Sequence, residues 1–296
     1  MDPISPAIVS AGAHAAKATD SFADEAAKAA GSLLTRLFGP SADVIGANWA
    51  DRLREQNMER LLKKTEKRAK ARETKGEDPG IANPRVASQV FASAEYSDSE
   101  VVAEYLSGVL ASSRDATGTS DAGVAWSTVV SRLSSDQLRL HYLIYASARQ
   151  RVIQQGFSRS NNAHSIEIVL HFTPLFALAG MTVTAFADAI DGLMREGLIG
   201  DGYHYAPTSQ LFEKEAARRN TTVEYPHESG LRVSMSVHGI RLFVWGNGAG
   251  DKGIDAYIDP SITLAAVDNP LPTVMTMFVK DDVVKTVQPG QEPPTA

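Results

Sequence analysis

The sequence predicts a mainly α-helical protein, in which a helical bundle over residues 1–160 precedes a smaller α+β domain over residues 161–260. Two observations support this prediction. In the first half, capping residues repeatedly precede apolar residues at helical spacing. After residue 182, a further amphipathic helix is followed by alternating apolar residues, which are typical of strands. Residues 261–296 contain five prolines and are expected to form an extension and a disordered tail.

Composition narrows the class of protein. Hydrophobic residues make up 43% of the 296 residues and charged residues 22%, which argues against wholesale disorder and against a polytopic membrane protein. Cysteine is absent, so disulfides, thiolate metal sites and cysteine nucleophiles are excluded. The lack of cysteine is also consistent with a reducing cytoplasm, where we expect the protein to reside.

The amino-terminal segment is rich in alanine and predicts a helix, which we expect to end near Gly39 and Pro40. Charged residues interrupt its apolar character, so the pattern of a cleavable secretion signal is missing. Its apolar residues can coat a partner helix or lie against a membrane surface. Because few basic residues accompany them, packing against protein is the favoured interpretation.

A basic helix follows, with Ser41 as its candidate cap and an apolar side that includes Trp49, Leu53, Leu61 and Leu62. Residues 52–75 hold ten basic and four acidic side chains, although the whole chain has a net charge of −6. Such a helix can bind phosphate, anionic lipid or an acidic protein surface. The alternative is a solvated face, in which Glu59 pairs with Lys63 and Glu66 with Lys70.

The next helices carry the clearest signals. Asn83-Pro84-Arg85 opens a short helix, and Ser97 with Glu100 forms a capping box before apolar residues that share one continuous face. A loop rich in Ser, Thr, Gly and Asp spans residues 112–123. After a helix over residues 124–133, Ser134 and Gln137 form a second capping box that opens a helix to about residue 154. These helices predict a bundle.

Several of these features together resemble the abortive-infection alpha family of bacterial phage-resistance proteins. The resemblance covers about residues 41–246 and depends on helix-packing features, with Tyr105-Leu106 standing where the family has a Trp-Ala pair. It implies a defence role and a winged-helix-like arrangement in the carboxy-terminal part. The matching features are Gly39-Pro40, Gly46, the basic residues 52–72, Glu95 with Asp98 and Glu100, and Leu133-Ser134.

The second half begins with an uncharged run of twenty residues, 168–187, which is about long enough to span a bilayer. Pro174 and Gly180 interrupt the run, and no cluster of Lys and Arg flanks it. We therefore expect two shorter buried pieces rather than a membrane span.

A winged-helix-like domain is predicted over residues 161–260. A helix over residues 182–194 ends in Gly197-Leu198-Ile199-Gly200, and a strand starts at residues 203–205. Alternation at residues 231–237 and the apolar residues 240–245 predict a β-hairpin that turns at Gly239.

Winged helices often bind DNA, and duplex binding requires basic residues along the recognition helix and wing. The helix over residues 182–197 has Arg195 against Asp188, Asp191 and Glu196, so it would repel phosphate. The candidate basic residues of the wing are Arg232 and Arg241. This balance favours a protein partner over nucleic acid.

Sequence motifs for catalysis or ligand binding are weak. The run Gly246 to Gly253 is similar to a phosphate loop, but no Gly precedes Lys252 and no Ser or Thr follows it, so a glycine-rich turn after a strand is favoured. His164, Glu167 and His171 have helical spacing for a metal site, but as a strand they would place the histidines on opposite faces. We expect no catalytic residue, cofactor or bound metal.

The sequence and the resemblance together predict a non-enzymatic, bacterial or prophage-encoded phage-defence protein that acts through macromolecular interaction. A winged-helix transcriptional regulator is the first alternative, and a membrane-perturbing effector that uses the amino-terminal helices is the second. The expected partner is a protein of the phage or the host. Formation of a homo-oligomer is a further possibility that the sequence does not decide. The candidate partner-binding residues are Lys63, Lys64, Lys67, Arg68, Arg232 and Arg241.

Overall fold

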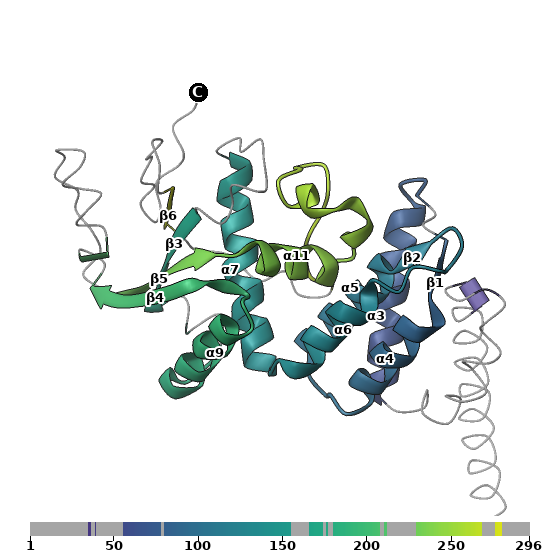
Figure 1. Cartoon of the computed structure of the whole chain (residues 1–296), viewed down its shortest axis with the longest axis horizontal. Coiled ribbons are helices and arrows are strands. Elements are labelled where there is room, and N and C mark those ends of the chain that lie inside the picture. Colours follow the sequence, from purple (N-terminus) through teal and green to yellow (C-terminus); the bar gives the residue numbers. More distant parts are fainter. Residues whose placement is uncertain are drawn as a thin grey trace, which may run out of the picture.

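A computed structural model describes residues 35–36, 39, 56–77, 80–154, 166–173, 176, 180–207, 210–211, 229–267 and 276–279. Over these residues the protein is mostly helical with a small sheet, which confirms the predicted mainly α class (Figure 1). The expected amino-terminal helices, including Trp49 and Leu53, lie outside the described residues, as do His164 and residues 280–296.

The bundle is built around helix α5 (Glu100–Ser112). Helices α3 (Gln56–Glu73), α4 (Pro84–Glu95), α6 (Gly123–Arg132) and α7 (Ser135–Gln154) pack against it (Figure 1). Every residue of α5 from 102 to 112 is buried, so the helix is enclosed on all sides and does more than present the one apolar face that was predicted.

Two of the predicted helix starts are confirmed in detail. The Ser134 backbone N–H donates to Gln137 Oε1 (2.7 Å), and the Gln137 N–H donates to Ser134 Oγ (3.2 Å), which is a capping box. Asn83 caps α4 by accepting from the Arg85 N–H. The predicted cap Ser97 is wrong, because α5 starts after Ser99, whose side chain makes no capping hydrogen bond.

The predicted polar loop after α5 contains a short strand. Strand β2 (Arg114–Asp115) pairs antiparallel with β1 (Ile81–Ala82). The Asp115 carboxylate then accepts hydrogen bonds from the backbone N–H groups of Thr117, Gly118 and Ser120. The Thr117 hydroxyl also donates to the carboxylate (2.6 Å), and this side-chain bond, followed by the backbone bonds, keeps the pKa of the Asp115 carboxyl well below its usual range.

The sheet has the order β4-β5-β3-β6, and its neighbouring strands are antiparallel. Its strands are β3 (Ile166–His171), β4 (Ile199–Pro207), β5 (Ser229–Met235) and β6 (Thr276–Val279). Helix α9 (Val183–Arg195) precedes β4, as predicted, and buries Phe186, Ile190 and Leu193.

The predicted second strand of the hairpin is wrong. Residues 237–246 form helix α11 (Val237–Gly246), which Ser236 caps by accepting from the Gly239 N–H (2.9 Å). Gly239 therefore lies in the first turn of a helix. Helix α11 packs against α5, α7 and the 3-10 helix η5 (Ile254–Tyr257), so most of its residues are apolar and buried, and a narrow exposed side with His238 and Arg241 is its one sign of helical spacing.

Helix α11 also joins the two predicted domains. It belongs to residues 161–260 by sequence, yet it packs on helices of residues 1–160, and one hydrophobic cluster includes residues from both parts. The division at residue 160 itself stays a prediction. In the part of the chain that the structure describes, no helix has both the length and the apolar character to cross a membrane. The uncharged run 168–187 begins in β3 and ends in α9.

Helices α5 and α11 approach each other closely at Gly108 and Gly246. A Cβ atom built on Gly108 would lie 1.8 Å from the Gly246 carbonyl oxygen, which is backbone and cannot rotate away. We expect Gly108→Ala to lower the free energy of unfolding by at least about 1–3 kcal/mol through overpacking, although Ala has the higher helix propensity. Chemical denaturation would measure this change.

A change to alanine at an exposed helix position provides the control for Gly108→Ala. The exposed Gly76 has no atom within 4 Å of an added Cβ, but its φ of +75° would strain any other residue. Ser88→Ala, at an exposed position of α4, is therefore the cleaner control and should leave stability nearly unchanged. A Gly108→Ala variant as stable as the wild type would contradict the close packing of α5 on α11.

Candidate partner-binding site

Helix α3 has a buried cationic face and an exposed cationic face. The side chains of Lys64 and Arg68 are only 2% and 7% exposed. Lys63 and Lys70 are 68% and 63% exposed. The difference follows from helical spacing, because positions 64 and 68 share the phase of Leu61, which is buried against the bundle.

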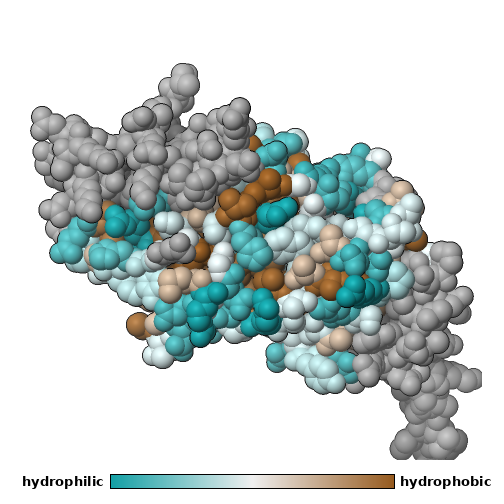
Figure 2. All heavy atoms as spheres, in the orientation of Figure 1, coloured by the Kyte–Doolittle hydropathy of each residue, from teal (hydrophilic) through white to brown (hydrophobic). Residues whose placement is uncertain are grey.

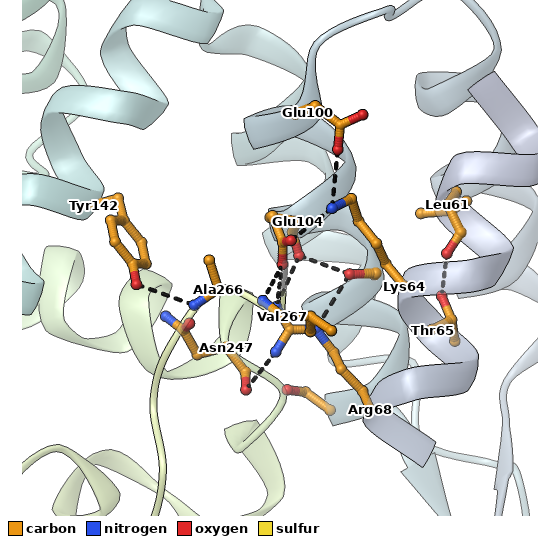
Figure 3. A network of polar contacts seen from close by, with 12 residues as sticks. Leu61, Lys64, Thr65, Arg68, Glu100, Glu104, Tyr142, Asn247, Ala266 and Val267 are labelled. Atoms are coloured by element: carbon orange, nitrogen blue, oxygen red, sulfur yellow. Dashed lines mark hydrogen bonds and ion pairs between the residues drawn. The ribbon is translucent and has the colours of Figure 1, made fainter. Parts of the chain in front are cut away.

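Glu104 of α5 lies between the two buried cations (Figure 3). Lys64 Nζ donates to Glu104 Oε1 (2.7 Å), and Arg68 Nη2 donates to Glu104 Oε2 (2.8 Å). Lys64 Nζ also lies 2.9 Å from Glu100 Oε2, at the edge of the bundle. Glu104 is thus shared by the two buried cations, and Glu100 is shared by Lys64 and Arg60, whose Nε lies 2.5 Å from Glu100 Oε1. Pairing of this kind is how buried charges are tolerated in proteins.

The same network reaches the carboxy-terminal part of the described chain. Arg68 Nη1 donates to the Asn247 carbonyl (3.1 Å), and the Val267 N–H donates to Glu104 Oε2 (3.1 Å). The Ala266 N–H donates to the Tyr142 hydroxyl (3.0 Å). These bonds connect α3, α5, the end of α11 and residues 266–267 in one polar assembly (Figure 3).

The predicted surface of Lys63, Lys64, Lys67 and Arg68 is therefore wrong for two of its members. Lys64 and Arg68 point into the protein and bind Glu104, which a high count of basic residues alone could not distinguish. A signal was present in the sequence: Leu61, Lys64 and Arg68 are spaced i, i+3 and i+7 on one helix face, and Glu104 is the one carboxylate within an otherwise uncharged helix segment, residues 101–112.

The exposed face of α3 remains a candidate site. Lys63, Lys67 and Lys70 border a groove of about 510 Å³, together with Glu59, Glu66 and Glu100. The predicted ion pairs Glu59–Lys63 (2.6 Å) and Glu66–Lys70 (2.8 Å) are confirmed. Among the described residues on the face shown in Figure 2, hydrophobic residues form separate patches between hydrophilic ones. Charge rather than a large apolar area therefore identifies the candidate site.

Arg232 and Arg241 do not share a wing. Arg232 is half-buried in the middle of β5, where it lies opposite Val169 of β3 and His204 of β4. Arg241 is exposed on α11, because its segment is a helix rather than a strand. Sequence analysis did not identify the aromatic stack beside it, in which Trp126 lies between His238 and Trp245.

The glycine-rich run after α11 is a turn, as predicted, but it follows a helix. Its amides are engaged within the protein: the Gly248 N–H donates to Trp245 O, the Ala249 N–H to Val244 O and the Gly250 N–H to Ser112 Oγ. A phosphate loop needs such amides to face its ligand. The structure therefore supports the turn rather than a loop that cradles phosphate with its backbone.

A buried Tyr–His cluster is another feature that sequence analysis missed. Tyr105 Oη and His141 Nδ1 are 2.6 Å apart, and His141 Nε2 is 3.0 Å from the Gly239 carbonyl oxygen. Burial lowers the pKa of His141 to about 3, so the imidazole is neutral and donates from Nε2 to that carbonyl. Both side chains are in the core, where they join α5, α7 and α11.

Across the described ranges no cluster of three or more His, Asp or Glu side chains could hold a metal ion. Of the spaced set His164, Glu167 and His171, the last two lie in β3, and His171 is buried.

Comparisons with known proteins add no relative: no family model, no curated protein and no solved structure matches this chain. The resemblance to the abortive-infection alpha family therefore stays a prediction.

Proposed function

We propose that this chain is a non-enzymatic phage-defence protein that acts in the cytoplasm by binding another macromolecule, most simply a protein. The residues that resemble the abortive-infection alpha family support the biological role. One structural observation supports the mode of action: α3 carries exposed lysines on one face while the buried ion pairs of Lys64 and Arg68 hold its other face to the bundle. A rigid charged helix suits the recognition of an oppositely charged partner, because it loses little conformational freedom on binding.

A winged-helix-like arrangement is part of this proposal. The order α7, β3, α9, β4, β5 supports it, since β5 pairs with both β4 and β3 and α9 directly precedes β4. On α9, Asp188 and Asp191 are exposed beside Arg195, and the Tyr203 hydroxyl donates to Asp191. An acidic helix surface repels DNA phosphates, which supports a protein partner for this part as well.

Reversal of the exposed α3 lysines tests the proposal. In a bacterial host that the gene protects, Lys63→Glu with Lys70→Glu is expected to reduce partner binding about tenfold, and protection with it, because complementary charge guides association. The fold should persist, since both side chains are more than half exposed and surface ion pairs contribute at most about 1 kcal/mol. Plaque counts on a broad phage panel, recorded beside the melting temperature, would measure both effects.

A matched control reverses two exposed arginines on other helices, Arg85→Glu with Arg132→Glu, whose side chains are 71% and 56% exposed. We expect this control to protect like the wild type. Full protection by the folded Lys63/Lys70 variant would exclude α3 as the interaction surface. Unchanged plaquing by the wild type across phages of several types would contradict the defence role itself.

A further inference from the structure

Two of the three tryptophans of the chain lie together at the surface where helices α6 and α11 pack on α5 (Figure 1). Trp126 belongs to α6 and Trp245 to α11, and both are half-buried. Their ring centroids are 5.9 Å apart and their planes are inclined by 24°, which is a stacked arrangement. A contiguous aromatic surface that stays partly open to solvent can mark a contact site.

His238 extends this stack to the surface of the protein. Its ring centroid lies 5.1 Å from that of Trp126, the two planes are inclined by 29°, and the residue is exposed. Trp245, Trp126 and His238 therefore form one column of nearly parallel rings, the aromatic ladder, with His238 at its open end. Desolvation beside the indole lowers the pKa of His238, and the nearby Arg241 guanidinium lowers it further, so the imidazole is neutral at pH 7.

The glycine-rich turn after α11 holds the inner end of the ladder. A Cβ atom on Gly250 would lie 2.4 Å from Trp245 Cδ2 and 2.9 Å from Ser112 Cβ, so only glycine lets the turn approach the indole this closely. Ser112 Oγ donates to the Trp245 carbonyl and accepts from the Gly250 N–H. A stack that is fixed in this way loses little conformational freedom when a ligand binds.

Three charged groups act on the open end of the ladder, namely Arg132, Glu196 and Arg241. Arg132 Nη2 and Glu196 Oε2 are 2.7 Å apart and balance each other. Arg241 follows His238 by three residues on the exposed side of α11. It makes no hydrogen bond or ion pair with the residues that the structure describes. The surplus charge among these three groups is therefore positive.

A neutral ring face beside an unpaired arginine matches the chemistry of an unpaired nucleotide. Every nucleobase has a flat π face that can stack on an aromatic side chain, and its phosphate can pair with a guanidinium. Only an unpaired base can stack in this way, because the bases of a duplex are covered on both faces by their neighbours. An acidic protein segment could pair with Arg241, but it has no regular succession of flat rings to continue the column.

We propose that the aromatic ladder binds single-stranded nucleic acid, with one unpaired base stacked on His238 and an adjoining phosphate paired with Arg241. Stacking dominates the binding, because only one phosphate is neutralised. One stacked base and one phosphate contact correspond to a dissociation constant on the order of 0.1–1 mM at low salt. This site is separate from the exposed face of α3 and does not depend on the defence role.

Titration of the full-length chain with hexathymidylate and with hexauridylate, followed by tryptophan fluorescence, tests the proposal. We expect saturable quenching, because the bound base extends a column that contains two of the three tryptophans. The tighter of the two hexamers identifies the preferred sugar. The logarithm of the association constant should fall with the logarithm of the salt concentration with a slope of about −0.7, as for one phosphate contact on a single strand.

Two competitors separate stacking from charge. An abasic hexamer has the same phosphates without bases, and hexaglutamate has the charge of an acidic protein segment. Neither is expected to displace the hexanucleotide. Displacement by the abasic hexamer at equal concentration would overturn stacking, and equal displacement by hexaglutamate would assign the surface to an acidic protein partner instead. Absence of quenching at several millimolar hexanucleotide would overturn the site.

Variants at the open end locate the binding. His238→Ala removes the terminal ring and is expected to weaken binding at least about fivefold, whereas His238→Phe keeps a ring face and should bind within about twofold of the wild type. Arg241→Gln should bring the salt slope close to zero. Both residues are exposed, so the fold should persist.

Arg85→Gln on α4, where the side chain is 71% exposed, is the matched control and should bind like the wild type. Wild-type affinity in both His238→Ala and Arg241→Gln, with unchanged melting temperatures, would place any binding elsewhere and overturn the proposal.

Discussion

Glu104→Ala is expected to lower the free energy of unfolding by about 3–5 kcal/mol, because it leaves two buried cations without their shared carboxylate. The side chains of Lys64 and Arg68 are only 2% and 7% exposed in the wild type, so water cannot easily replace Glu104. The Val267 N–H would also lose its acceptor. The loss is a large fraction of the stability of an ordinary domain. Chemical denaturation monitored by circular dichroism would measure it.

Two comparisons separate the buried network from surface charge. Glu59→Ala removes a carboxylate from an exposed i, i+4 pair on α3 and is expected to lower the free energy of unfolding by less than about 0.5 kcal/mol. Replacing Lys64, Arg68 and Glu104 together with Met, Met and Leu should recover much of the stability lost in Glu104→Ala, because no unpaired charge stays buried. A Glu104→Ala variant no less stable than Glu59→Ala would show that the network contributes little.

Acid is expected to destabilise the protein through His141. Its folded-state pKa is lowered to about 3 by burial, whereas an unfolded histidine titrates near 6.5. Between these values the unfolded chain binds a proton that the folded protein does not, so this stability is present above pH 6.5 and is lost as the pH falls toward 3. His141 alone is therefore expected to lower the free energy of unfolding at pH 4 by about 3 kcal/mol relative to pH 7.

The measurement is the difference in unfolding free energy between pH 7 and pH 4. Carboxyls such as Glu77, whose pKa Lys252 lowers, change stability in the same direction, so wild type must be compared with a variant. His141→Gln keeps a donor and an acceptor in the core but cannot titrate. It is expected to be less stable at pH 7 and to lose less on acidification. An equal loss in both proteins would show that His141 is not the group responsible.

Local signals in the sequence determined the helix starts that depend on a few neighbouring atoms. The capping box of Ser134 and Gln137 and the Asn83 cap before Pro84 form as their residue types predict, since the donors and acceptors lie within three residues of each other. The amphipathic helix α9 was also predictable, because it buries one side and exposes the other. The ion pairs Glu59–Lys63 and Glu66–Lys70 follow from the same helical spacing.

Tertiary contacts decided what local pattern left open. Residues 240–245 are rich in apolar side chains that suit a strand, and they become helical because Ser236 caps them and α5, α7 and η5 surround them. Lys64 and Arg68 are basic like exposed neighbours such as Lys63, and their burial is tolerable because partners from other segments, above all Glu104 on α5, lie beside them. Helix periodicity depends on residues that are close together in the sequence. The partner that stabilises a buried charge or an apolar surface comes from a distant segment of the sequence. Only the tertiary structure therefore determines which of these residues are buried.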